Sequence, residues 1–197
     1  MADGHVGNYI QRMQTLSKEI IGKIGRIRLL LTDCDGVLTD GSVYYSANGE
    51  QMKRFSVRDG LGVERLQKLV RIETGLITGE NSEIVMQRVE KLGIREYHPG
   101  CLDKFSKLKE ILSQRKYSAD MVAYIGDDFN DEEIMRHVGL SASPADALPA
   151  ISEVANLVMA NKGGYGAFRE FAEIIIYYQK NHNGYKKESA GWGSHYW

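Results

Sequence analysis

The chain contains little cysteine and no long apolar run, and each absence excludes a class of protein. Its only cysteines, Cys34 and Cys101, do not form a Cys-x-x-Cys pair. A disulfide framework or a zinc knuckle is therefore not expected, and a reducing cytoplasm is the expected location. The longest apolar runs, such as 27–31, which Arg28 interrupts, are far too short to cross a bilayer. Residues 1–9 lack the basic segment and apolar core of a secretory signal.

An excess of charge of one sign is also absent. The 197 residues include 25 Lys or Arg and 26 Asp or Glu, which gives a formal net charge of −1. No global field therefore attracts nucleic acid or an anionic membrane, and we expect neither as a partner. Hydrophobic residues make up 43% of the chain and charged residues 26%, as in an ordinary globular protein, and the length fits one domain.

Apolar strand-like segments alternate with helical segments along most of the chain. This alternation predicts an α/β fold, a Rossmann-like doubly wound parallel sheet with helices on both faces, in which ligands bind at the carboxyl ends of the strands. We expect a helical extension over 1–25, with its helix at 9–24, one α/β domain over 26–179 and a flexible tail over 180–197. The expected strands are 26–32, 95–98, 121–125, 140–143 and one ending at 75–78, and the expected helices are 61–70, 82–91, 103–114, 131–137 and 167–178.

A β-hairpin is predicted over 41–57. Its two strand-like runs, 42–45 and 51–55, flank an Asn-Gly pair at 48–49, which is typical of a hairpin turn. Between Asp35 and Thr78 the chain has room only for this hairpin and one helix. No separate cap domain is therefore expected, and something else must shape the substrate pocket.

Two carboxylates follow the first buried strand. Asp33 and Asp35 stand one residue apart, just before Gly36. Like charges this close repel one another in a confined site, and a divalent cation removes that cost. Mg²⁺ prefers hard oxygen ligands and retains several waters, so it suits a site that must also take a phosphate. A solvated acidic turn is the alternative, but the apolar strand before Asp33 and the glycine after Asp35 argue against it.

Three further segments place polar residues at strand or helix ends. Thr78 and Gly79 end one strand, and the glycine lets a ligand approach the backbone closely. Lys104 begins a helix, and Asp127 and Asp128 follow another buried strand. Taken singly, Thr78 could be a helix cap and Lys104 a solvated surface residue. The second acidic pair would supply oxygen ligands opposite the first.

The order of these pieces resembles the four motifs of the haloacid dehalogenase superfamily. Asp-x-Asp comes first, then Thr, then Lys, then Asp-Asp, over 26–178. The resemblance implies a phosphatase in which Asp33 is the nucleophile and Asp35 the general acid and base. Thr78 and Lys104 would hold phosphoryl oxygens and neutralise charge in the transition state. Receiver domains combine similar residues, but in them the paired acids come first and the phosphoacceptor later, the reverse of this order.

The same resemblance implies a magnesium site. Mg²⁺ would bind the Asp33 carboxylate, the Asp35 main-chain carbonyl and Asp127, with Asp128 in support. Cys34, between the first two acids, is expected to point away from the site and fill the core, because side chains alternate along a strand.

The hairpin region resembles one capless subfamily, the 3-deoxy-manno-octulosonate 8-phosphate phosphatases and their relatives. In that subfamily the hairpins pair into a homotetramer, and each covers a neighbour's active site. An exposed two-stranded hairpin is marginal on its own, so an oligomer also makes physical sense. The matching residues are Gly49-Glu50, Lys53, Phe55, 57–60, 139–141, 145–147, 163–167 and 169–170.

One residue departs from the octulosonate phosphatases, which typically have Arg after the Thr-Gly pair where this chain has Glu80. Glu80 with Arg88 and Lys91 is similar to relatives that act on nine-carbon keto-deoxy acids, such as 2-keto-3-deoxynononate 9-phosphate. Glu80 can accept hydrogen bonds from sugar hydroxyls, while Arg88 or Lys91 can pair with a carboxylate. Gly79 and Arg58 complete the expected substrate-binding set. A solvated, charged helix face is the plain alternative.

The resemblance therefore implies hydrolysis of a 2-keto-3-deoxy sugar-acid phosphate through an aspartyl-phosphate, in sialic acid or lipopolysaccharide biosynthesis, with the nine-carbon substrate favoured over the eight-carbon one. A catalytically inactive oligomerisation or binding module is the alternative, since this fold also occurs as an inactive domain attached to sugar-activating enzymes. A phosphotransferase or a nucleotide phosphatase is a third candidate. The complete set of motif residues argues against the inactive module, because a degenerate domain has no reason to keep them together.

Overall fold

The computed structural model describes residues 16–182 of the chain. Residues 9–15 of the predicted helix at 9–24 and residues 183–197 of the predicted tail at 180–197 lie outside these residues. The strands are β1 (Leu29–Thr32), β2 (Thr39–Ser46), β3 (Gly49–Phe55), β4 (Glu73–Ile77), β5 (Glu96–His98), β6 (Val122–Ile125), β7 (Leu140–Ser143) and β8 (Leu157–Val158). The helices are α2 (Lys18–Arg26), α3 (Val57–Val70), α4 (Glu83–Leu92), α5 (Lys104–Arg115), α6 (Glu132–His137), α7 (Pro149–Val154) and α8 (Ala167–His182), with short 3₁₀ turns η1 (Ala119–Met121) and η2 (Phe129–Asp131).

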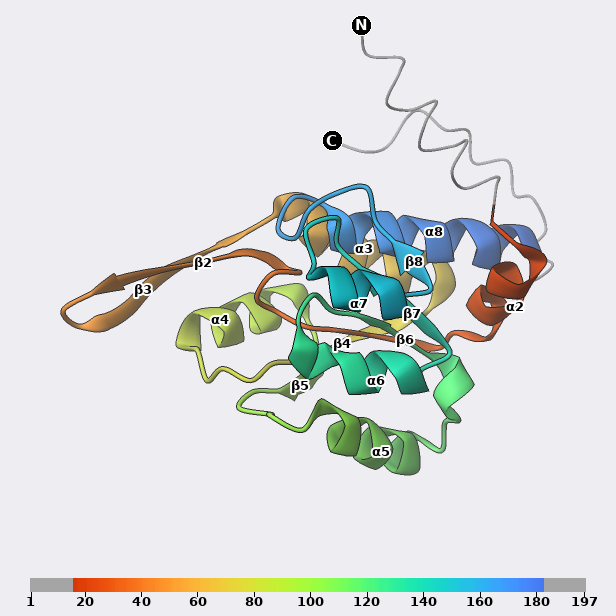
Figure 1. The fold of residues 1–197 in the computed structure, drawn as a ribbon, viewed down its shortest axis with the longest axis horizontal. Helices are drawn as coiled ribbons and strands as arrows, with labels where there is room; N and C mark the ends of the chain where they lie inside the picture. The colour runs from red at the N-terminus through yellow and green to blue at the C-terminus, as the bar shows by residue number, and fades with distance from the viewer. Residues whose placement is uncertain (1–15, 183–197) are drawn as a thin grey trace, which may run out of the picture.

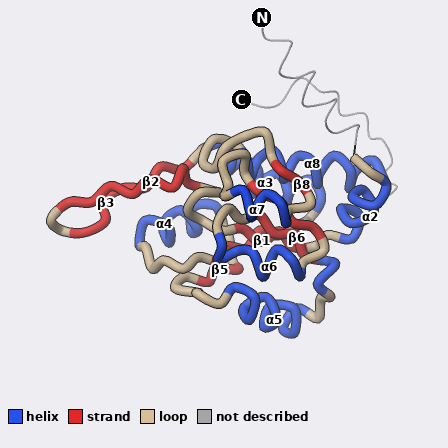
Figure 2. Tube along the Cα trace, in the orientation of Figure 1, coloured by secondary structure: helices blue, strands red, loops and turns tan. Residues whose placement is uncertain are grey.

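Six of the strands form one parallel sheet with helices on both faces (Figure 1, Figure 2). Its strand order is β5-β4-β1-β6-β7-β8, so the predicted α/β fold with a parallel sheet is confirmed. The chain fills one side of β1 with β4 and β5 and then crosses to β6 on the other side. Sheets of this kind bind ligands at the carboxyl edge where the strand order reverses, which here lies beside β1.

Successive residues of the buried strands face opposite layers of the molecule. Leu30 packs in a cluster with residues of α2, α3, α4 and α8, among them Leu66 and Phe171. Leu29 and Leu31 pack in a second cluster with residues of α5, α6 and α7. Because both faces are covered, the strands read as continuous apolar runs in the sequence. The same alternation carries on beyond β1 and decides which way the next residues point.

Cys34 shows this alternation directly. It is fully buried in the α3 and α8 layer, on the opposite side from its neighbour Asp33, so its predicted place in the core is confirmed. Burial and the nearby Asp35 and Asp33 raise the pKa of the Cys34 thiol well above its usual value. The thiol is a packing group in this fold.

Helix boundaries agree with the sequence where a capping side chain marks them. Ser82 accepts a hydrogen bond from the Val85 amide and caps α4, and Gly93 ends that helix with a φ of 67°, so that both ends lie within one residue of the predicted helix at 82–91. The first buried strand begins at Leu29, later than predicted, because α2 continues through Arg26. At the other end α8 runs to His182 and includes the first residues assigned to the tail.

The start of α3 differs most from the prediction. The helix begins at Val57, four residues before the predicted start, because the Ser56 hydroxyl accepts hydrogen bonds from the main-chain amides of Arg58 and Asp59. Gly60 and Gly62 weaken the helical signal in this first turn. A Cβ at Gly62 would lie 3.2 Å from atoms of Phe168 and Arg169. The glycine therefore lets α3 pack closely on α8.

The hairpin of β2 and β3 projects from the body of the molecule (Figure 1). Val43 pairs with Lys53 and Ser46 with Gly49, which confirms the predicted hairpin. Its two-residue turn lies at 47–48, one residue before the predicted turn at 48–49. Its outer part is exposed, and Tyr45 has 73% of its surface accessible. Lys53 is the exception, because its side chain is only 2% exposed. Within the described residues no helix combines the length and the apolar character that a membrane span requires.

Candidate active site

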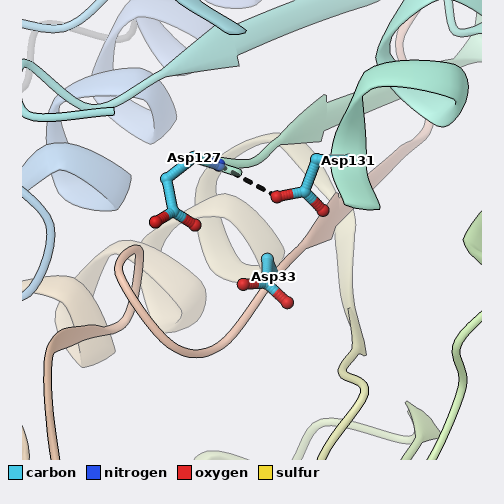
Figure 3. A group of neighbouring side chains, drawn as sticks. All are labelled: Asp33, Asp127 and Asp131. Carbon is cyan, nitrogen blue, oxygen red and sulfur yellow. Dashed lines mark hydrogen bonds between the residues drawn. The ribbon is translucent and has the colours of Figure 1, made fainter. Parts of the chain in front are cut away.

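Three carboxylates meet at the carboxyl edge of the sheet, as Figure 3 shows. Asp33 follows β1, Asp127 follows β6, and Asp131 ends the 3₁₀ turn η2. One oxygen from each lies within 4.8 Å of the others. The sequence predicts the first two of these residues as neighbours across adjacent strands, and the structure brings them together.

Lys104 supplies the positive charge of this cluster. It is the first residue of α5, which Asp103 caps, and its side chain is 1% exposed. Its Nζ lies 2.7 Å from Asp33 Oδ1 and 2.6 Å from Asp131 Oδ1. Burial lowers the pKa of Lys104, but the two carboxylates raise it by more, so the net shift is upward and the group is a cation. Asp33 and Lys104 thus form a direct ion pair.

Asp131 is a site residue that the sequence prediction did not include. Its two oxygens accept hydrogen bonds from Lys104 Nζ, the Tyr124 hydroxyl and the main-chain amides of Asp127 and Asp128. Because it accepts hydrogen bonds from four donors, this carboxylate fixes the positions of Lys104, Tyr124 and the loop at Asp127. Its signal in the sequence is the spacing alone, four residues after Asp127, which puts it one turn further along the loop that follows β6.

Asp33 and Asp127 carry more negative charge than the cluster neutralises. Burial and the charge of Asp131 raise the pKa of Asp33 to about 7, although Lys104 opposes the shift. Burial and the charge of Asp33 raise the pKa of Asp127 to about 8. Asp127 Oδ1 is buried and has no hydrogen-bond partner. Two confined acids and an oxygen without a donor fit a hard divalent cation, so these residues suit the metal that the sequence predicts.

Gly36 makes room for this arrangement. It has a φ of 84°, and a Cβ built there would lie 2.0 Å from Asp127 Oδ2. Only glycine lets the loop after β1 pass this close to the carboxylate, at a backbone angle that other residues rarely adopt. Asp128, predicted to support the metal, is exposed and instead caps η2, where its side chain accepts a hydrogen bond from the Phe129 amide.

Asp35 contacts the hairpin. Its Oδ2 is 2.6 Å from Lys53 Nζ, and its Oδ1 accepts a hydrogen bond from the Thr39 hydroxyl at 3.0 Å. Lys53 also lies 3.4 Å from Glu50. Burial lowers the pKa of Lys53, but the contact with Asp35 raises it by more, so it too is a cation. The sequence marks Lys53 as a family feature and does not assign it to the site.

Thr78 and its neighbours occupy the end of β4, beside β1 in the sheet. Thr78 is buried, and its hydroxyl accepts a hydrogen bond from the Glu80 amide at 3.3 Å. Glu80 itself is exposed, so its side chain is accessible to a ligand. Gly79 has only the side chain of Leu102 near its Cβ position, at 3.6 Å, so its backbone is open to a ligand.

The other predicted substrate residues lie on α3 and α4. Arg88 and Lys91 line a groove of about 610 Å³ with residues of α3, including Leu61. Arg88 donates a hydrogen bond to the Ser56 carbonyl oxygen at 3.0 Å, and its buried Nε has no partner. Arg58, in the first turn of α3, is exposed. Within the described chain, the structure does not bring these three cations into contact with the carboxylate cluster.

Comparison with known proteins gives a consistent result. A family model described as haloacid dehalogenase-like hydrolase matches residues 39–167. The match begins after Asp33 and Asp35, so the evidence for those two residues is their position in the structure. Among curated proteins the chain is 39% identical over 161 residues, 82% of this chain and 85% of the relative, to 3-deoxy-D-manno-octulosonate 8-phosphate phosphatase KdsC of Escherichia coli K12.

Solved structures of the same kind share the fold. The cobalt-bound octulosonate 8-phosphate phosphatase YrbI of Haemophilus influenzae matches with a TM-score of 0.77 and 38% identity, covering 80% of this chain and 91% of that one. The 3-deoxy-D-manno-octulosonate 8-phosphate phosphatase of Moraxella catarrhalis, in complex with a magnesium ion, a phosphate ion and KDO, matches with a TM-score of 0.81 and 33% identity. The match covers 85% of this chain and 96% of that one. The chain is therefore similar to phosphatases along most of its length.

Proposed function

Because the chain belongs to the haloacid dehalogenase-like hydrolases and is a phosphatase of that family, we propose that it hydrolyses the phosphomonoester of a 2-keto-3-deoxy sugar acid, with Asp33 as the nucleophile. One observation carries the proposal: a buried Asp33 carboxylate lies 2.7 Å from Lys104 Nζ and within 4.8 Å of a carboxylate oxygen of Asp127, at the carboxyl edge of the sheet. A nucleophile, a fixed cation and a place for a metal are thereby gathered at one point.

The reaction then needs two displacements. Asp33 attacks phosphorus, the bond between phosphorus and the sugar oxygen breaks, and that oxygen takes its electron pair and a proton from Asp35. Water next attacks the phosphorus of phospho-Asp33 and gives a proton to Asp35, so that inorganic phosphate leaves and both aspartates return to their first state. Lys104 and Thr78 would hold phosphoryl oxygens through both steps.

Mg²⁺ is the proposed cofactor. The Asp33 carboxylate, the Asp35 main-chain carbonyl and Asp127 would hold it, and the raised pKa values of both carboxyl groups support this choice. When bound, the cation neutralises charge on the carboxylates and on the phosphoryl oxygens, which allows one anion to attack another. One similar structure is a cobalt-bound form and another is a complex with magnesium, which fits a site for a divalent cation.

The sugar acid is proposed to have nine carbons in preference to eight. Glu80, exposed beside Thr78, supports this choice because it can accept hydrogen bonds from sugar hydroxyls, where an Arg would donate them. Gly79 offers an open backbone, and Arg58, Arg88 and Lys91 are proposed to pair with the substrate carboxylate. These three cations do not contact the carboxylate cluster of their own chain. They are therefore proposed to bind a substrate that occupies the active site of a second copy.

A homotetramer is therefore proposed as the working assembly. The hairpin exposes the large apolar side chains Tyr44, Tyr45 and Met52, which is costly in a monomer and typical of an interface. Light scattering after size-exclusion chromatography measures the assembly. A monomer at micromolar concentration would remove the assembly from the proposal and leave the chemistry untouched.

A substrate panel tests the proposal. Pure protein with Mg²⁺ is incubated with 3-deoxy-D-manno-octulosonate 8-phosphate, its nine-carbon homologue and a nucleotide monophosphate, and phosphate release is measured. We expect turnover of both sugar acids, with the higher kcat/KM for the nine-carbon one. In Glu80→Arg the ratio should shift toward the eight-carbon substrate. Folded protein that released no phosphate from either sugar acid would disprove the proposed function.

A further inference from the structure

Lys53 combines a buried charge with an exposed setting. The strand that carries it, β3, belongs to the projecting hairpin, and most of the residues around it are exposed or half-buried. Its own side chain is 2% exposed. A buried ammonium group is costly unless carboxylates compensate it, so a lysine held in this way signals a specific partner.

The partner is Asp35, and the contact fixes both ends of that carboxylate. Lys53 Nζ lies 2.6 Å from Oδ2, and the Thr39 hydroxyl donates to Oδ1 at 3.0 Å. Thr39 belongs to the first strand of the hairpin and Lys53 to the second. The Asp35 carboxylate is thus oriented from the hairpin, whereas Asp33 is oriented from the body of the molecule by Lys104.

A second contact extends this connection to the end of β4. Lys53 lies 3.4 Å from Glu50, and Glu50 accepts a hydrogen bond from the Ser82 hydroxyl. Ser82 is the N-cap of α4, the helix that follows the loop with Thr78 and Glu80. Lys53 therefore connects the hairpin directly to Asp35 and, through Glu50, to Ser82 at the start of α4.

We propose that Lys53 is a positioning residue, which holds the Asp35 carboxylate in the orientation that passes a proton to the leaving oxygen. The inference rests on the proposed function, because it assigns Asp35 to that proton transfer. Proton transfer by a positioned side chain contributes about 10²–10⁴-fold, and a displacement of about 1 Å can cost about 10²-fold. Loss of Lys53 should therefore reduce the proton transfer and leave the attack by Asp33 in place.

Two substrates separate these effects. A sugar-acid phosphate has a poor leaving group that needs the proton, while p-nitrophenyl phosphate has a good one that does not. The value of kcat/KM covers the steps up to release of the leaving group. We expect Lys53→Met to lose about 10²-fold in kcat/KM with the sugar-acid phosphate, by the positioning argument above, and far less with p-nitrophenyl phosphate. Lys53→Arg should recover much of the loss.

The ratio of the two kcat/KM values is the decisive readout, because the fraction of folded enzyme cancels in it. Asp35→Asn should change this ratio in the same direction, and adding Lys53→Met to Asp35→Asn should change it no further. Glu50→Gln, which loosens Lys53, should change it less. Lys109→Met, the same substitution at an exposed lysine on α5, should leave the ratio as it is.

Each failure has its own meaning. If Asp35→Asn changes the ratio and Lys53→Met lowers both substrates by the same factor, the inference on Lys53 is wrong and the proposed function stands. If Asp35→Asn leaves the ratio unchanged, Asp35 does not protonate the leaving group, and both the assignment of Asp35 and the role of Lys53 fall. A changed ratio for Lys53→Met that Lys53→Arg restores supports the inference.

Discussion

Two buried lysines stand on either side of the reaction site, and the fold holds them in different ways. Lys104 begins a helix packed on the central sheet, and its carboxylate partners Asp33 and Asp131 are 8% and 0% exposed. Lys53 is on a projecting strand, and its partners Asp35 and Glu50 are 27% and 20% exposed. The body of the protein fixes Asp33, the proposed nucleophile, whereas contacts of the hairpin fix Asp35, the proposed acid and base.

The comparison teaches that one site can be rigid on one side and adjustable on the other. In the body, the carboxylate of Asp131 accepts hydrogen bonds from four donors. On the hairpin side each group has one or two partners. The predictions below test this contrast, beginning with the strongest expected effect.

Removal of the proposed nucleophile, Asp33, should have the largest effect. Asp33→Asn should lower kcat by about 10⁴-fold or more, as loss of a covalent nucleophile does. The fold should persist, because the substitution relieves the repulsion that raises the pKa of Asp127. Phosphate release and circular dichroism measure the two effects. A variant that retained full turnover would remove Asp33 from its role.

Removal of the body lysine should affect both rate and stability. Lys104→Met leaves two buried carboxylates without their cation, which should lower the free energy of unfolding by about 3–5 kcal/mol. The value of kcat should fall by about 10²–10³-fold through loss of charge stabilisation in the transition state. Lys53→Met should destabilise less, because its carboxylate partners reach solvent. Urea titration of both variants checks the order; an equal loss of stability would contradict the contrast.

A methyl group at Gly36 should affect the metal more than the fold. Gly36→Ala places a carbon 2.0 Å from Asp127 Oδ2, so that carboxylate must move. Displaced ligands typically cost about 10–100-fold in metal affinity. Isothermal titration with Mg²⁺ measures the change. Gly93→Ala, also at a positive φ (67°) but with nothing within 4 Å of the added carbon, is the matched control and should bind Mg²⁺ as the parent does.

The stability of metal-free protein should fall as pH rises. Folded Asp33 and Asp127 have pKa values of about 7 and about 8, against 3.8 ordinarily, so between pH 4 and 8 the folded state binds more protons than the unfolded chain. The free energy of unfolding therefore decreases across that window. Mg²⁺ replaces those protons and should raise the melting temperature more at pH 8 than at pH 5. An equal rise at both pH values would contradict this linkage.

The mildest prediction concerns the tip of the hairpin. Replacing Tyr44 and Tyr45 with Ser should weaken the proposed tetramer, because both rings are exposed in a single chain. Light scattering at several concentrations should show a smaller assembly, while p-nitrophenyl phosphate is still hydrolysed. An unchanged tetramer would place the interface elsewhere on the molecule.

The sequence predicts those parts of this protein that local chemistry determines. The α/β fold follows from apolar strands alternating with helices, and the ends of α4 follow from Ser82 and Gly93. The sequence also predicts that Asp33 and Asp127 are neighbours, because the carboxyl ends of parallel strands lie at the same edge of the sheet.

The rest depends on contacts that no local pattern reveals. Asp131 reads as part of a helix start, and only the folded chain places it against Lys104. In the sequence, Lys53 is only a hairpin residue that matches the subfamily. Its contact with Asp35 is visible only in the folded chain. The early start of α3 is hidden for a similar reason, because Gly60 and Gly62 are present to allow packing.

The central place of β1 has a consequence for how substrates come and go. This strand is hydrogen-bonded to β4 on one side and β6 on the other, so its amides should be among the slowest in the protein to exchange with solvent. The hairpin has no third strand and should open first. We therefore expect product release to proceed by motion of the hairpin, while β1 and Asp33, the residue that follows it, stay in place.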